Sequence, residues 1–214
     1  MKLILWSLVF MVMSSVSFAS DFVTKGDINK SSIGMFKSFF TKEKCDQILI
    51  DTFTICYDYD RKSPTAVYVE VTGETVEKDI DKRPPFFTDK RVKKEFRTTS
   101  KDYTNTGYDR GHFGASDASH DWDKKHQKAT YSMANIVPQT PFANRYKFIA
   151  LEKHEREMAV KYGRLENLTI AYWNNRPKKI GDSQLHVPSG FAKLFTDGKN
   201  YKECFFVWNN DKYD

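Results

Sequence analysis

Apolar and polar side chains alternate in several short segments of the chain, and such alternation is typical of half-buried β-strands. These segments are rich in β-branched and aromatic residues and are separated by polar or proline-containing stretches. We therefore predict strands over residues 53–59, 66–72, 168–173, 193–195 and 204–208. The first two should form a hairpin, and Asp197-Gly198 favours a tight turn before the last strand.

A helical pattern begins near Asn144. Apolar residues recur there every three or four positions and form one stripe, made of Phe148, Leu151, Met158, Ala159 and Tyr162. Gly163 is a typical residue at the end of such a helix. The stripe predicts a helix that buries one face in the core.

Three other segments complete the expected fold. Residues 42–51 should form a short helix, residues 78–92 a proline-containing loop, and residues 130–133 a short extended run that Pro138 and Pro141 end. Together the elements predict an α+β fold, in which helices pack on a central antiparallel sheet.

The chain has 214 residues, of which 40% are hydrophobic, enough for one domain with a full core. Residues 1–19 stand apart, because Lys2 precedes an apolar run and small residues lead to Ala19. This is the layout of a secretory signal peptide. The alternative is an uncleaved membrane anchor, but the run is short for a span of about 20 residues.

We therefore expect cleavage after Ala19 and a single domain over residues 20–214. The mature protein should be exported to the periplasm or the medium, without stable membrane association. Loss of Lys2 lowers the formal net charge from +6 to +5. A basic exported protein suits a polyanionic partner, although many basic proteins bind no nucleic acid.

The sequence has three cysteines, Cys45, Cys56 and Cys204. In an oxidising compartment one pair could form a disulfide. Cys45 and Cys56 are closest in sequence and are our first choice, while pairing of either with Cys204, or three free thiols, are the alternatives. No CxxC spacing is present to indicate a thiolate zinc site.

Residues 107–158 carry side chains suited to phosphodiester chemistry. His112 follows a glycine, which allows close approach to a substrate, and its imidazole is mostly a base at neutral pH. Arg110 offers a planar fork of donors for phosphate oxygens. Asn144 offers a hard oxygen ligand for magnesium, and Glu152 a carboxylate for metal-bound water. This set favours attack of water on a phosphodiester.

The segment resembles the DNA/RNA non-specific endonuclease family of the ββα-metal class, which includes the Serratia-type and endonuclease G-like nucleases. The family pattern reads DRGH, then S-x-N-x-x-P-Q, an Asn nine residues beyond the first Asn, and Leu-Glu with an Arg four further on. In this chain His112 ends DRGH, Asn135 and Asn144 are nine apart, and Glu152 and Arg156 follow in register.

The resemblance implies a ββα-metal active-site unit in which His112 acts as general base. One Mg²⁺, replaceable by Mn²⁺ or another divalent cation, would be held by Asn144 and water. Glu152 lies eight residues further on, about 12 Å of helix rise, so it should hold metal-bound waters rather than the ion itself. Arg156 could brace its carboxylate from position i+4.

The remaining assignments concern phosphate contact and support. Arg110 should contact the phosphate, and Arg83 matches a family arginine that precedes a Phe and an Asp. Asp109 and Asn135 should support the loops. The implied substrate is DNA, with RNA as a further candidate, cut with little sequence preference to leave 5′-phosphates.

Two other classes of function fit the same residues. One is a nucleic-acid-binding protein whose site has lost its activity. The other is a phosphodiesterase or phosphatase that acts on small esters. The sequence specifies no oligomeric state.

Overall fold

The computed structural model describes residues 24–26, 36, 38–78, 80, 82–120 and 123–212. The expected signal peptide, residues 1–19, lies outside the described residues. None of the helices in the described part of the chain is long and apolar enough to cross a membrane.

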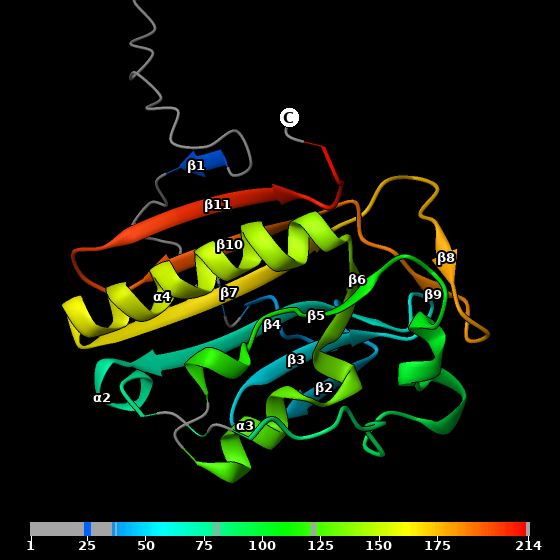
Figure 1. Ribbon diagram of the computed structural model, residues 1–214, viewed down its shortest axis with the longest axis horizontal. Coiled ribbons are helices and arrows are strands. Elements are labelled where there is room, and N and C mark those ends of the chain that lie inside the picture. Colours follow the sequence, from blue (N-terminus) through cyan, green and yellow to red (C-terminus); the bar gives the residue numbers. More distant parts are fainter. Residues whose placement is uncertain are drawn as a thin grey trace, which may run out of the picture.

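A seven-stranded sheet forms the centre of the molecule, in the order β1-β11-β10-β7-β4-β3-β2 (Figure 1). Its strands are β1 (Thr24–Gly26), β2 (Gln47–Ile50), β3 (Thr54–Asp58), β4 (Ser63–Thr72), β7 (Arg164–Tyr172), β10 (Gly190–Thr196) and β11 (Lys202–Trp208). Every neighbouring pair is antiparallel. The α+β class and the antiparallel sheet expected from the sequence are confirmed.

Shorter elements surround the sheet. Two small ribbons pair β5 (Asp109–His112) with β6 (Ile136–Gln139) and β8 (Lys179–Ile180) with β9 (Leu185–His186). The helices are α2 (Gly73–Val76), α3 (Lys124–Thr130) and α4 (Ile149–Tyr162), and a π-helix (Ala143–Phe148) runs directly into α4. Single 3₁₀ turns cover Lys94–Phe96, Ser100–Tyr103, Asp117–Ser119 and Met133–Asn135.

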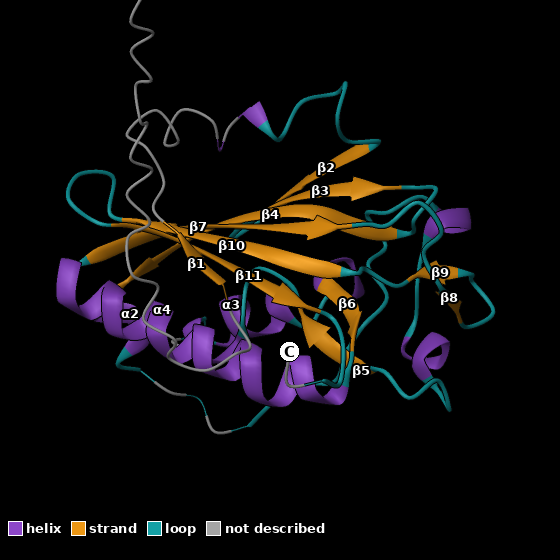
Figure 2. Ribbon diagram, turned by 90° about the horizontal axis from the view of Figure 1, so that it is seen from above, coloured by secondary structure: helices purple, strands orange, loops and turns teal. Residues whose placement is uncertain are grey.

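The labelled helices lie on one side of the sheet (Figure 2). The apolar stripe of α4 packs there, with Phe148, Leu151 and Ala159 buried as expected. Alternate residues of β10 point to the same side, so that Phe191 meets Phe148 edge-on at 5.1 Å between ring centroids. The helix and the sheet thus share one core.

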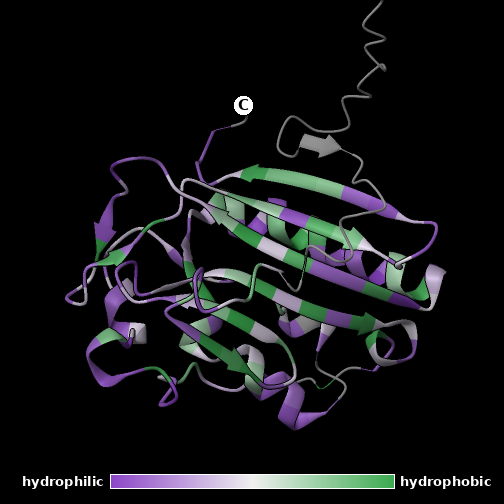
Figure 3. Ribbon diagram, turned by 180° about the vertical axis from the view of Figure 1, so that it is seen from behind, coloured by the Kyte–Doolittle hydropathy of each residue, from purple (hydrophilic) through white to green (hydrophobic). Residues whose placement is uncertain are grey.

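Seen from the opposite face of the sheet, hydrophobic and hydrophilic residues are interspersed along the strands (Figure 3). A smaller cluster is buried on it, formed by Phe36, Cys45, Cys56, Ala66 and Leu168. A disulfide between Cys45 and Cys56 ties the segment before β2 to β3, and Cys204 is a free, half-buried thiol.

Two local predictions are wrong. Residues 42–51 form a turn and then β2, because pairing with β3 at the sheet edge overrides the weak helical signal. Residues 130–133 are not an extended run, because α3 continues to Thr130, a turn follows at Tyr131, and a 3₁₀ turn begins at Met133. Pro138 lies inside β6, where an edge position tolerates a residue without an N–H.

We predict that loss of the disulfide weakens the fold measurably. Cys45 and Cys56 are 11 residues apart, and closing a loop of that length restricts the unfolded chain by about 3 kcal/mol. The double variant Cys45→Ser/Cys56→Ser should lose stability of that order in urea unfolding. Cys204→Ser is the matched control and should unfold within about 0.5 kcal/mol of the wild type, so equal losses in both variants would contradict the assignment.

Candidate active site

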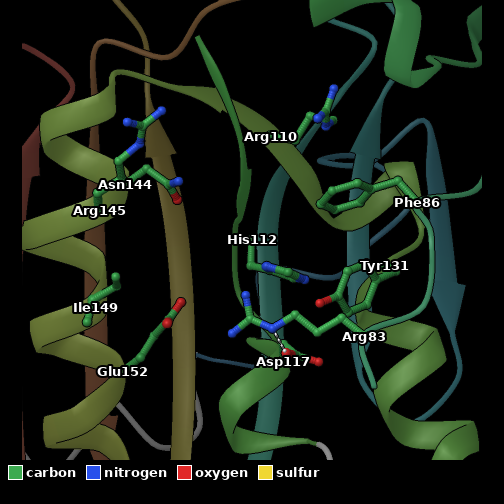
Figure 4. Close-up of a pocket in the computed structure, with 10 residues that line it drawn as sticks. All are labelled: Arg83, Phe86, Arg110, His112, Asp117, Tyr131, Asn144, Arg145, Ile149 and Glu152. Atoms are coloured by element: carbon green, nitrogen blue, oxygen red, sulfur yellow. Dashed lines mark ion pairs between the residues drawn. The ribbon is translucent and has the colours of Figure 1, made fainter. Parts of the chain in front are cut away.

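A cavity of about 400 Å³ opens between α4 and the β5–β6 ribbon (Figure 4). Its lining residues are Arg83, Phe86, Arg110, His112, Asp117, Tyr131, Asn144, Arg145, Ile149 and Glu152. They come from segments far apart in the sequence, which the ribbon, the π-helix and the loop before the Lys94–Phe96 turn bring together. Five of the residues predicted from the sequence for direct roles (Arg83, Arg110, His112, Asn144 and Glu152) meet here.

The ribbon places His112 at the edge of the cavity. Gly111 lies directly under Gln139, and a Cβ atom at position 111 would stand 2.2 Å from the Gln139 side chain. A larger residue at this position would require the Gln139 side chain to move. Close packing against Gln139 therefore explains why the DRGH motif has a glycine at this position.

His112 is held among aromatic rings. Tyr131 meets it edge-on at 5.0 Å and Phe86 lies at 5.9 Å between ring centroids. Its Nε2 atom is buried without a hydrogen-bond partner among the described residues. Burial, followed by the charge of Arg83, lowers the pKa of His112 to about 3. The imidazole is therefore neutral at neutral pH and able to accept a proton.

Asp109 fixes the side chains at the start of the helix. Its carboxylate accepts a hydrogen bond from Asn144 Nδ2 at 3.0 Å and a fork from Arg145 at 2.8 and 2.9 Å. The Arg145 fork holds the pKa of Asp109 below its usual range, so the carboxylate stays charged. Because the Asn144 nitrogen is engaged, its amide oxygen is turned toward Glu152 (Figure 4).

The π-helix brings Asn144 and Glu152 to one face. Eight residues of α-helix turn through about 800°, which would leave the two side chains roughly 80° apart. The wider π turns over Ala143–Phe148 remove most of this difference. Both side chains therefore point into the same cavity (Figure 4).

Glu152 differs from the other acids of the cavity. Burial raises its pKa to about 7, while the charge of Lys193 acts in the opposite direction. The expected ion pair with Arg156 is absent from the described contacts, and Arg156 Nη1 is buried without a partner. That prediction is wrong because the Glu152 carboxylate points into the cavity (Figure 4), so that Arg156 acts on it through its charge alone.

Guanidinium groups border the cavity on several sides. Arg83 Nε binds Asp117 Oδ2 at 3.0 Å, although its side chain is 75% exposed. Arg110 is exposed and stacks over Phe86, with its central carbon 5.4 Å from the ring centroid. With Arg145 they form a cationic rim suited to phosphate oxygens.

Asn135 does not reach the cavity and has a structural role. It is fully buried, and its Nδ2 donates to the carbonyls of Ala115 at 2.8 Å and Thr130 at 3.0 Å. Its Oδ1 accepts from the backbone of Gly114 and Ala115. It thereby ties the loop after His112 to the end of α3.

The sequence pattern did not indicate Phe86, Asp117, Tyr131, Arg145 or Ile149 as functional site residues. Only Arg145 could have been found from the sequence, since it directly follows Asn144 in the motif. His186 is buried, and His154 binds Glu203 at 2.7 Å. Neither histidine lines the cavity.

Residues 32–214 match the family model described as DNA/RNA non-specific endonuclease. The chain belongs to this family. It is 32% identical to mitochondrial endonuclease G of Homo sapiens over 155 residues, covering 67% of this chain and 52% of that protein. It is also 30% identical to the mitochondrial nuclease of Saccharomyces cerevisiae over 138 residues, covering 63% of this chain and 41% of that protein.

The chain thus spans about half the length of the curated relatives it matches. Among solved structures it is similar to a crystal structure of an EndoG/EndoGI complex, described as showing the mechanism of EndoG inhibition. The TM-score is 0.71 at 23% identity, with 86% of this chain and 82% of that chain covered. At this identity the similarity supports the fold.

We predict that His120, buried beside the cavity, makes stability depend on pH. Its Nδ1 lies 2.9 Å from the Ser116 carbonyl, and burial lowers its pKa to about 4. An unfolded histidine titrates near 6.5, so below that pH the unfolded chain takes up a proton that folded His120 does not. Its contribution to stability is present above about pH 6.5 and is lost as the pH falls toward 4.

The measurement is urea unfolding of the wild type and His120→Gln at pH 7.5 and pH 5. The wild type should lose roughly 1–2 kcal/mol more than the variant between these two pH values. The same loss in both proteins would show that His120 takes up protons equally in both states.

Proposed function

We propose that this protein is a metal-dependent endonuclease that hydrolyses phosphodiester bonds of DNA, with RNA as a further substrate. One observation carries the proposal. The cavity holds the neutral imidazole of His112 opposite the amide oxygen of Asn144, within a rim of three guanidinium groups. This is a proton acceptor, a hard oxygen ligand and a phosphate clamp in one place.

His112 takes the proton from the attacking water, and the hydroxide displaces the 3′ oxygen in line, leaving a 5′-phosphate. Arg110, Arg83 and Arg145 hold the phosphate oxygens and the charge that gathers on them. Glu152, from the opposite wall, orders water in the cavity. Because these contacts address the phosphate and not the bases, sequence preference should be slight.

The donor set fits a hydrated magnesium ion. The described residues include no group of three His, Cys, Asp or Glu side chains that could enclose a metal. An ion at Asn144 would therefore keep most of its waters, as Mg²⁺ does in proteins. Bound there, it supplies positive charge to the scissile phosphate and the leaving oxygen, and Mn²⁺ or another divalent cation could replace it.

We further propose that residues 1–19 direct export and that residues 20–214 form the secreted domain. The disulfide between Cys45 and Cys56 supports this proposal, because structural disulfides persist in oxidising compartments. The domain would act in the periplasm or the medium.

The direct test is nicking of supercoiled plasmid by residues 20–214 with Mg²⁺, with EDTA, and with His112→Ala. Cutting should require Mg²⁺ and fall roughly 10²–10⁴-fold in the variant, since that is the usual contribution of a general base. His126→Ala, on α3 away from the cavity, should cut normally. Cutting that survives His112→Ala would contradict the assignment, and hydrolysis of small esters without plasmid nicking would favour a small-molecule phosphodiesterase.

We also predict that Arg110 binds a backbone phosphate. In the inactive His112→Ala background, Arg110→Ala should weaken duplex binding equally for different sequences. The slope of log K against log salt should fall by about 1, as expected for one lost phosphate contact. Fluorescence anisotropy between 50 and 200 mM salt measures this slope. The exposed Arg176 lies outside the cavity, so Arg176→Ala should keep the wild-type slope.

A further inference from the structure

A lysine side chain is buried under the floor of the cavity. Lys193 lies in the middle of β10 and is only 1% exposed. Its Nζ atom stands over the rings of Phe148 at 5.3 Å and Phe195 at 5.9 Å. It has no hydrogen-bond partner among the described residues. A buried ammonium group is costly, and an apolar side chain of the same length would fit this core with less penalty.

The sheet register places Lys193 next to Glu152. Lys193 pairs with Thr169 of β7, and two residues before Thr169 the side chain of Asn167 binds Glu155 of α4 at 2.5 Å. α4 lies along β7 and runs in the opposite direction (Figure 1). Two strand residues span about 6.6 Å and one helical turn about 5.4 Å. Lys193 therefore faces the turn of α4 that precedes Glu155, the turn that carries Glu152.

The charges around Glu152 agree with this placement. Glu155 and Asp117 raise its pKa, and Arg156 and Lys193 lower it, with Lys193 the strongest of the four. Asp117 is already paired with Arg83, and Glu155 is bound by Ser119 and Asn167. Lys193 has no such partner among the described residues, so its charge is available to Glu152.

We propose that Lys193 is a positioning residue that acts as the buried counter-charge of Glu152. Its positive charge favours the ionised form of this carboxylate against the burial that opposes it. The inference deepens the proposed function, since it assigns a role in the same site to a residue outside the cavity lining.

The test is a ¹³C NMR titration of Glu152 in metal-free protein labelled on glutamate, with the signal assigned from Glu152→Gln. Removing the ammonium group in Lys193→Met should raise the Glu152 titration midpoint by about one pH unit or more, a tenfold change in proton affinity. Lys202→Met, on the outer face of β11, is the matched control and should leave the midpoint in place. An unchanged midpoint in folded Lys193→Met would overturn the proposal.

Activity provides a second readout. The acid limb of the plasmid-nicking rate should move to higher pH in Lys193→Met, with roughly five-fold less activity at pH 7 and recovery above pH 9. In a Glu152→Gln background the shift should vanish. A loss that is equal at every pH would indicate a merely structural role and contradict the proposal.

Lys193→Gln replaces Lys193→Met if the latter does not fold. Failure of the wild type to cut DNA would overturn the proposed function, while the NMR titration would still test Lys193.

Discussion

The carboxylate of Asp109 is the contact on which the site geometry depends. It lies on the same short strand as His112 and binds two consecutive side chains of the π-helix, Asn144 and Arg145. The imidazole of His112 and the amide oxygen of Asn144 belong to different elements, and this contact fixes one relative to the other. A two-stranded ribbon by itself is marginally stable, so it needs such an anchor to hold a reactive side chain in place.

Behind this contact lies a polar layer inside the core. Glu155, Asn167 and Ser119 are fully buried between α4, β7 and the loop that follows His112, and both Asn167 and Ser119 donate to the Glu155 carboxylate. Buried polar groups of this kind stabilise a fold only when they are satisfied, and they then restrict it to one arrangement. The layer links the helix that carries Glu152 to the loop that carries Asp117. It therefore positions two walls of the cavity at the cost of apolar packing.

Much of the fold and half of the cavity could be predicted from sequence, because alternation and motif spacing are local. Five strands of the central sheet and the long helix follow from alternation and periodicity, and His112, Asn144 and Glu152 follow from the spacing of the family motif. The π-helix does not, since its wider turn leaves no mark in the spacing of apolar residues. Arg145 acquires its role from Asp109, 36 residues away. Nothing in the sequence indicated that Lys193 lies in the core, because an isolated lysine in a strand normally points to solvent. Only the packing of α4 on the sheet shows that this lysine is buried.

Burial in the cavity shifts the pKa values of His112 and Glu152 in opposite directions. A low-dielectric cavity disfavours both charged forms. For His112 this is useful, because the neutral imidazole is the form that accepts a proton. For Glu152 it is harmful, because the neutral acid cannot order water around a cation or help to balance its charge. A site that needs both groups must therefore offset the effect of burial on one of them alone. Positive charge beneath Glu152 opposes that effect, and the same charge also lowers the proton affinity of His112. One buried lysine thus has a use other than attraction of a polyanion: it opposes the protonation of Glu152 that burial favours.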